Sequence, residues 1–207
     1  AEMNRLGIMV DVSHLSDAAV RQAVELSTVP VIASHSALRH FTPDFERNLS
    51  DELAKLIAAK GGVVQIPFGT AFVNPRAAAN TRDWFRESLA FDRRNAERVA
   101  AGEPPLDRAA FEAQWAADHP KVEAPISDVL YQIDYAVKLV GVDHVGIGSD
   151  FDGVDGELPE GLRTVADFPN LIAGLQARGY ADADIRRILG GNLLRVWTAI
   201  EAGARHP

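Results

Sequence analysis

Four short apolar segments most strongly constrain the fold of this chain of 207 residues. Each is rich in β-branched residues and is followed by sequence with helical periodicity, a pattern typical of buried strands in a parallel sheet that helices cover. The four predicted strands are residues 7–12, 29–33, 63–68 and 143–148. The main predicted helices are residues 17–26, 51–60, 126–139, 168–178, 183–189 and 193–199. The sequence therefore predicts an α/β fold.

The number of strand–helix units limits the architecture further. A (β/α)8 barrel has eight such units and takes about 250 residues, so four units correspond to half a barrel. Residues 69–123 have no strand pattern but contain two amphipathic helical stretches, at 82–100 and 108–117. We predict that this segment is a helical insertion after the third strand, either a lid or an accessory hairpin, and not a separate domain.

The first seven residues have the pattern of a helix end with a glycine cap, and they contain no helix start. We therefore expect residues 1–207 to be part of one longer barrel domain whose N-terminal half is absent. Any signal peptide would precede residue 1, so the sequence predicts no compartment.

The composition excludes several classes of protein. The 21 Lys and Arg residues against 29 Asp and Glu residues give a net charge of −8 without a basic run, which argues against a nucleic-acid partner. No apolar run is long enough to span a membrane. The chain has no cysteine, so disulfides, thiolate ligands and cysteine nucleophiles are excluded. The chemistry must come from His, Asp, Glu and Arg.

His14 and His35 are the strongest indication of a functional site. Each comes directly after a predicted strand, and one predicted helix separates them. Neighbouring parallel strands lie about 4.8 Å apart, so both imidazoles should emerge side by side at the carboxyl edge of the sheet. Two ligands of one zinc ion would then have their nearest ring nitrogens within about 4.5 Å of each other. The alternative is a pair of unrelated polar residues at strand ends.

Asp150 follows the last predicted strand and lies among small residues in the run 146–153. A carboxylate that faces a metal site can take a proton from water and later return it to a leaving amine. Asp150 by itself could equally be structural. Asp152 and Gly153 form an ordinary turn pattern, so we expect the Asp152 side chain to bind the backbone of the turn.

Arg47 lies in the loop after the second predicted strand, just before a helix cap. A guanidinium at this position could bind a substrate carboxylate through two hydrogen bonds, although most loop arginines are simply solvated. The remaining histidines have no comparable position and are expected to be structural or exposed to solvent: His40, His119, His144 and His206.

Taken together, these segments resemble the membrane dipeptidase family, also called peptidase family M19. The matching stretches occur in family order along nearly the whole chain. They are residues 7–14, 30–37, 47–52, 61–64, 143–153 and 191–196.

The resemblance implies the C-terminal half of a (β/α)8 barrel of the metal-dependent hydrolase type. It also implies a zinc-dependent dipeptidase that cleaves the peptide bond of dipeptides through a metal-bound hydroxide, with two zinc ions in the complete active site. The resemblance allows a homodimer as the form of the complete enzyme. By this resemblance His14 and His35 bind one zinc ion. Asp150 is the catalytic acid and base, and Arg47 binds the C-terminal carboxylate of the dipeptide.

The chain also departs from the family pattern. It contains no His-x-Asp motif, and Glu157 and Glu160, after the last strand, are badly placed to bridge two metals. We therefore expect the 207 residues alone to bind zinc weakly and to hydrolyse no dipeptide. Two alternatives stay open: a barrel amidohydrolase acting on another amide, a lactone or a lactam, and an inactive half-barrel that is a structural or binding module.

Overall fold

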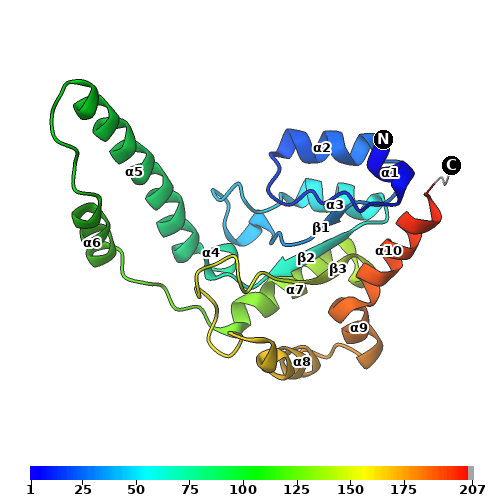
Figure 1. Ribbon diagram of the computed structural model, residues 1–207. Coiled ribbons are helices and arrows are strands. Elements are labelled where there is room, and N and C mark those ends of the chain that lie inside the picture. The colour runs from blue at the N-terminus through cyan, green and yellow to red at the C-terminus, as the bar shows by residue number, and fades with distance from the viewer. Residues whose placement is uncertain (205–207) are drawn as a thin grey trace.

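A parallel three-stranded sheet forms the centre of the computed structural model, which describes residues 1–204 (Figure 1). The strands lie in the order β1 (Ile32–Ala33), β2 (Val63–Pro67) and β3 (Val145–Ser149). Ile32 pairs with Val63, and Val64 pairs with Val145. Because all the pairs are parallel, the carboxyl ends of the strands meet at one edge of the sheet. His206 lies outside the described residues.

The segment predicted as the first strand, residues 7–12, does not form a regular strand. It makes one parallel bridge, Asp11 to Ile32, with hydrogen bonds from Val12 N to Ile32 O (2.8 Å) and from Ile32 N to Val10 O (3.0 Å). Its partner β1 is only two residues long, so the pairing cannot extend into a ladder. The prediction of four strands is therefore corrected to three strands and one bridged segment.

Helices pack around the sheet (Figure 1). They are α1 (Glu2–Leu6), α2 (Asp17–Leu26), α3 (Asp51–Ala59), α7 (Ile126–Val140), α8 (Phe168–Ala177), α9 (Asp182–Arg186) and α10 (Asn192–Ala202). Ser16 and Ser50 cap α2 and α3, since their side chains accept hydrogen bonds from backbone N–H groups of the first turn. Helix α9 ends earlier than predicted because the chain passes into a π-helical turn, Arg187–Gly191.

The two faces of the sheet have separate apolar clusters. Val64 of β2 belongs to the main core, and the adjacent Val63 belongs to a smaller cluster under α10, because successive strand residues point to opposite faces. The main core includes Leu53, Ile57, Ile66, Ile133, Leu171 and Leu175, all fully buried. Among the described residues, no helix combines the length and the apolar character needed to cross a membrane.

The segment 69–123, all of which the structure describes, contains helices α4 (Thr70–Val73), α5 (Pro75–Ala100) and α6 (Arg108–Asp118) and no strand. It follows β2, the third of the predicted strands. Helices α5 and α6 form an arm that projects from the sheet and its helices (Figure 1).

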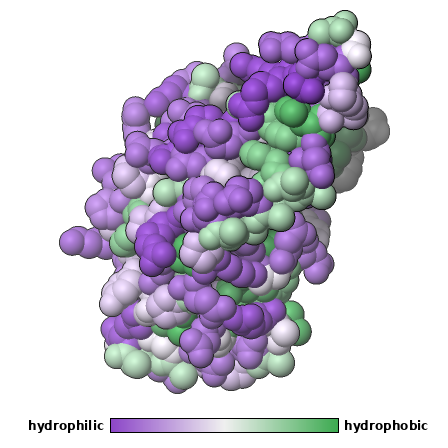
Figure 2. All heavy atoms as spheres, turned by 90° about the vertical axis from the view of Figure 1, so that its left-hand side faces the viewer, coloured by the Kyte–Doolittle hydropathy of each residue, from purple (hydrophilic) through white to green (hydrophobic). Residues whose placement is uncertain are grey.

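Aromatic residues hold the two helices of the arm together. The ring of Phe111 in α6 lies 4.6 Å from that of Phe91 and 5.6 Å from that of Trp84, both in α5. The arm also exposes apolar side chains, including Phe85 and Leu89, and hydrophobic atoms interrupt its mostly hydrophilic surface (Figure 2).

Gln132 of α7 connects this helix to the loops around the candidate site. Its side chain is fully buried. The amide oxygen accepts a hydrogen bond from Leu38 N (3.0 Å), and the amide nitrogen donates to Leu38 O and to Phe72 O (both 3.3 Å). The loop after β1 and the end of α4 are thereby fixed to one helix.

We predict that Gln132→Leu lowers the free energy of unfolding by about 1–3 kcal/mol, because it leaves the buried Leu38 N–H without a partner. Urea denaturation followed by circular dichroism measures this loss. Gln176→Leu, at an exposed position of α8, is the matched control and should change stability little. An equal loss in the two variants would contradict this account of Gln132.

Candidate metal centre

His14 and His35 meet at the carboxyl edge of the sheet. His14 follows the bridged segment 7–12, and His35 follows β1 after a single residue. Their Nε2 atoms are 2.8 Å apart, and the ring centroids are 4.8 Å apart. The expectation that the nearest ring nitrogens lie within about 4.5 Å is confirmed.

The ring nitrogen of His14 that faces His35 is an acceptor. Arg47 Nη2 lies 3.1 Å from His14 Nε2, and a guanidinium can only donate. The Nε2 atom of His14 therefore carries no proton that it could donate to the Nε2 atom of His35. Two bare imidazole nitrogens at 2.8 Å would repel each other, so the pair requires either a proton on one ring or a cation that both nitrogens bind.

The donor set of the chain fits part of a metal site. Two imidazole nitrogens are typical zinc ligands, whereas a catalytic zinc ion normally has three protein ligands and a water. Among residues 1–204, no group of three or more His, Cys, Asp and Glu side chains is placed to hold a metal ion. A complete site would thus need further ligands from outside the described residues.

The backbone is strained at two of the predicted site residues. His14 and Asp150 both have a φ of 66°, in the left-handed region that side chains other than glycine rarely adopt, and Ser149 has a φ of 49°. Such conformations cost about 1–3 kcal/mol each, persist only where the surroundings impose them, and are concentrated at functional sites. The strain supports a functional interpretation of both loops.

Arg47 is bound tightly to the two histidine loops. Besides its contact with His14, its guanidinium donates to His35 O (2.9 Å) and to Ser36 Oγ (3.2 Å), and it lies over the Phe72 ring at 5.1 Å. Burial lowers the pKa of Arg47 from its usual range, although the group stays a cation at neutral pH. A metal ion at His14 Nε2 would compete with the guanidinium for the same lone pair.

Asp150 lies in the loop after β3, within electrostatic reach of the same cluster. Burial lowers the pKa of His14, the positive charge of Arg47 and the neighbouring His35 ring lower it further, and the negative charge of Asp150 opposes this shift. A Cβ atom at Gly153 would collide with the Asp150 carboxylate, so the glycine allows this loop conformation.

Asp152 does not bind the turn as predicted. Its side chain is exposed and makes no hydrogen bond to the described residues, because a backbone bond from Gly153 N to Asp150 O (3.3 Å) already closes the turn.

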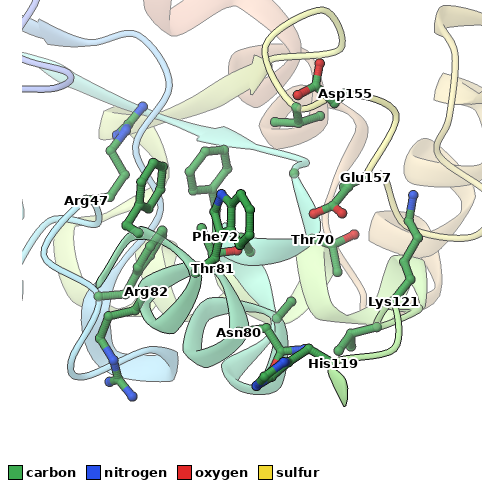
Figure 3. A pocket seen from close by; sticks show the side chains of 18 of the residues that line it. Arg47, Thr70, Phe72, Asn80, Thr81, Arg82, His119, Lys121, Asp155 and Glu157 are labelled. Carbon is green, nitrogen blue, oxygen red and sulfur yellow. The ribbon is translucent and has the colours of Figure 1, made fainter. Parts of the chain in front are cut away.

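A cavity of about 1310 Å³ extends from this cluster toward the arm (Figure 3). Of the four predicted site residues, His14 and Arg47 line it, whereas His35 and Asp150 do not. Figure 3 shows Arg47 and Phe72 on one side of the cavity and Thr70, Glu157 and Lys121 on the other.

The arm also contributes to this cavity, which the sequence patterns did not predict. Trp84, Trp115 and His119 line it, and the His119 ring stacks on Trp115 at 3.6 Å. The available signal was the spacing of four residues between Trp115, near the end of the predicted helix, and His119, which follows directly after α6.

The family description "Membrane dipeptidase (Peptidase family M19)" matches residues 1–206. A protein of Schizosaccharomyces pombe described as an uncharacterized dipeptidase is 34% identical over 201 residues, which are 97% of this chain and 38% of that protein.

Solved structures agree with this match. The probable dipeptidase PvdM of Pseudomonas aeruginosa is 33% identical with a TM-score of 0.75, over 98% of this chain and 53% of that one. A metallopeptidase of Rhodobacter sphaeroides, solved with a phosphinate mimic of the dipeptide L-Ala-D-Ala, is 27% identical with a TM-score of 0.71, over 96% of this chain and 44% of that one. The chain thus spans about half the length of these structures or less.

We predict that Arg47→Leu raises the pKa of His14 in the metal-free protein, because it removes the neighbouring positive charge. In the wild-type protein the pKa of the His14 imidazole is lower in the folded state than in the unfolded state. Protonation of His14 therefore destabilises the fold as the pH falls from about 6.5 through the lowered pKa. NMR titration of the imidazole resonances measures the shift. Arg82→Leu, which removes another arginine of the cavity, should leave the titration unchanged. A His14 pKa that Arg47→Leu does not raise would contradict the assigned geometry.

Proposed function

Because the chain belongs to the membrane dipeptidase family, peptidase family M19, we propose that it is part of a zinc-dependent dipeptidase and that His14 and His35 bind one of its zinc ions. The observation that carries this proposal is the 2.8 Å separation of the two Nε2 atoms at the carboxyl edge of a parallel sheet. The dipeptide mimic bound to the Rhodobacter sphaeroides relative supports dipeptides as substrates.

We propose that the three strands and the bridged segment are the C-terminal half of one (β/α)8 barrel domain, with residues 69–123 as its insertion. The supporting observations are the parallel strand order and the partial coverage of longer relatives. The remaining metal ligands would come from residues outside this chain, since residues 1–204 offer no third ligand. Bound zinc ions would polarise the substrate carbonyl and lower the pKa of water.

Arg47 is the proposed binding group for the C-terminal carboxylate of the dipeptide. Its guanidinium can make paired hydrogen bonds to a carboxylate, and its stacking on Phe72 keeps it at the wall of the cavity. In this role it would exchange its contact with His14 for one with the substrate. A requirement for a carboxylate next to the cleaved bond would restrict the enzyme to dipeptides.

Asp150 is the proposed acid and base. A carboxylate in reach of the histidine cluster can accept a proton from the attacking water and then donate it to the leaving amine. The left-handed backbone at Ser149 and Asp150 turns the loop sharply at the end of β3, where this carboxylate belongs in such a site.

We predict that Asp150→Asn lowers kcat for dipeptide hydrolysis by about a hundredfold or more and leaves the zinc content unchanged. Steady-state assays and metal analysis of the complete protein test both statements. Asp152→Asn is the matched control, because Asp152 is exposed two residues away and should be dispensable. Full activity of Asp150→Asn would exclude the acid and base role of Asp150.

A panel of dipeptides, other amides, lactones and lactams, assayed with the complete protein, would identify the substrate class.

We also predict that residues 1–207 expressed alone bind zinc weakly and hydrolyse no dipeptide, whereas the complete polypeptide does both. The reason is the number of ligands: residues 1–204 supply two imidazoles, whereas a catalytic zinc ion normally has three protein ligands. Parallel assays on the two proteins provide the measurement. A fully active chain of 207 residues would show that the missing ligands lie within it or in a second copy.

A further inference from the structure

One carboxylate connects the two loops that carry His14 and His35. Asp11 Oδ1 accepts hydrogen bonds from Ser13 N and from Ser34 N, both at 3.0 Å. Its second oxygen, Oδ2, lies 2.5 Å from Ser34 Oγ. Asp11 thereby binds the residue that directly precedes each histidine.

The hydrogen bonds continue from Asp11 to the imidazole of His35. Ser34 Oγ lies 2.7 Å from His35 Nδ1. An ionised carboxylate can only accept, so the single hydroxyl proton of Ser34 is donated to Asp11. The Ser34 oxygen is then an acceptor for His35, which places a proton on Nδ1 and leaves the lone pair of a neutral ring on Nε2.

We infer that Asp11 and Ser34 are positioning residues that act as a relay of hydrogen bonds, holding His35 in the Nδ1–H tautomer with its Nε2 lone pair directed at the metal position. The inference rests on the proposed zinc role of His35. Partners of this kind fix the ring of a ligating histidine and increase its basicity. The relay differs from the contacts of His14, whose Nε2 atom meets Arg47.

Two simpler roles for Asp11 and Ser34 predict different results. Asp11 as a direct metal ligand does not agree with the geometry, because residues 1–204 hold no group of three potential ligands around one point. If Asp11 and Ser34 only stabilised the loops, removal of any hydroxyl of the network should weaken zinc binding to the same extent. Ser13 offers the comparison: its buried Oγ accepts from His35 N (3.0 Å) and pairs with Ser36 Oγ (3.1 Å) but contacts no imidazole.

The test uses the protein in its complete natural length, with zinc affinity measured by competition with a chromophoric chelator. Ser34→Ala should weaken zinc binding about ten- to a hundredfold, and Ser34→Thr, which keeps the hydroxyl, should restore it. Ser13→Ala should change the affinity little. Asp11→Asn should weaken binding in the same direction, and its effect should largely disappear in the Ser34→Ala background, because Asp11 acts through Ser34.

In the metal-free His14→Ala protein no second imidazole faces His35 Nε2, so long-range ¹H–¹⁵N NMR of this variant reads the tautomer of His35 directly. We expect the Nδ1–H form of His35 in His14→Ala and when Ser13→Ala is added to it, and a loss of this preference when Ser34→Ala is added instead. Equal weakening of zinc binding by Ser13→Ala and Ser34→Ala, or an unchanged tautomer when Ser34→Ala is added to His14→Ala, would overturn the inference. A wild-type protein that binds no zinc would refute the proposed function, whereas the tautomer would still decide the positioning role.

Discussion

Neighbouring parallel chain segments end at the same edge of a sheet, and the candidate metal centre depends on this geometry. The bridge between Asp11 and Ile32 sets the register of the segment 7–12 against β1, which brings the following loops together. His14 and His35, separated by 20 residues and helix α2 in the sequence, consequently have Nε2 atoms 2.8 Å apart. A register shift of one residue would turn these side chains to the other face and separate the pair.

The charges around His14 and His35 determine which ligands this site can bind. Two imidazole nitrogens that face each other need a cation or a shared proton, while the adjacent Arg47 disfavours protonation of His14. Asp11 and Asp150 supply the opposing negative charge. In the proposed function, this cluster would supply two metal-binding nitrogens, a carboxylate for proton transfer and a guanidinium for the free carboxylate of a dipeptide.

The sequence predicted those features that depend on local patterns. Apolar runs located β2 and β3, serine caps located the starts of α2 and α3, and the residues after the strands located the histidine pair. Pattern alone could not show that residues 7–12 form only a bridge, because that depends on the length of the partner strand. Nor could it reveal the relay from Asp11 through Ser34, which joins residues 23 positions apart, or the exposed side chain of Asp152.

The central claim is that His14 and His35 bind one metal ion through Nε2. Anomalous diffraction at the zinc absorption edge, from crystals of the complete protein grown with zinc, tests it most directly. The account predicts an anomalous peak about 2.0–2.1 Å from the Nε2 atoms of both histidines, with Arg47 displaced from His14. A zinc peak elsewhere, with His14 Nε2 still bound to Arg47 and His35, would contradict it.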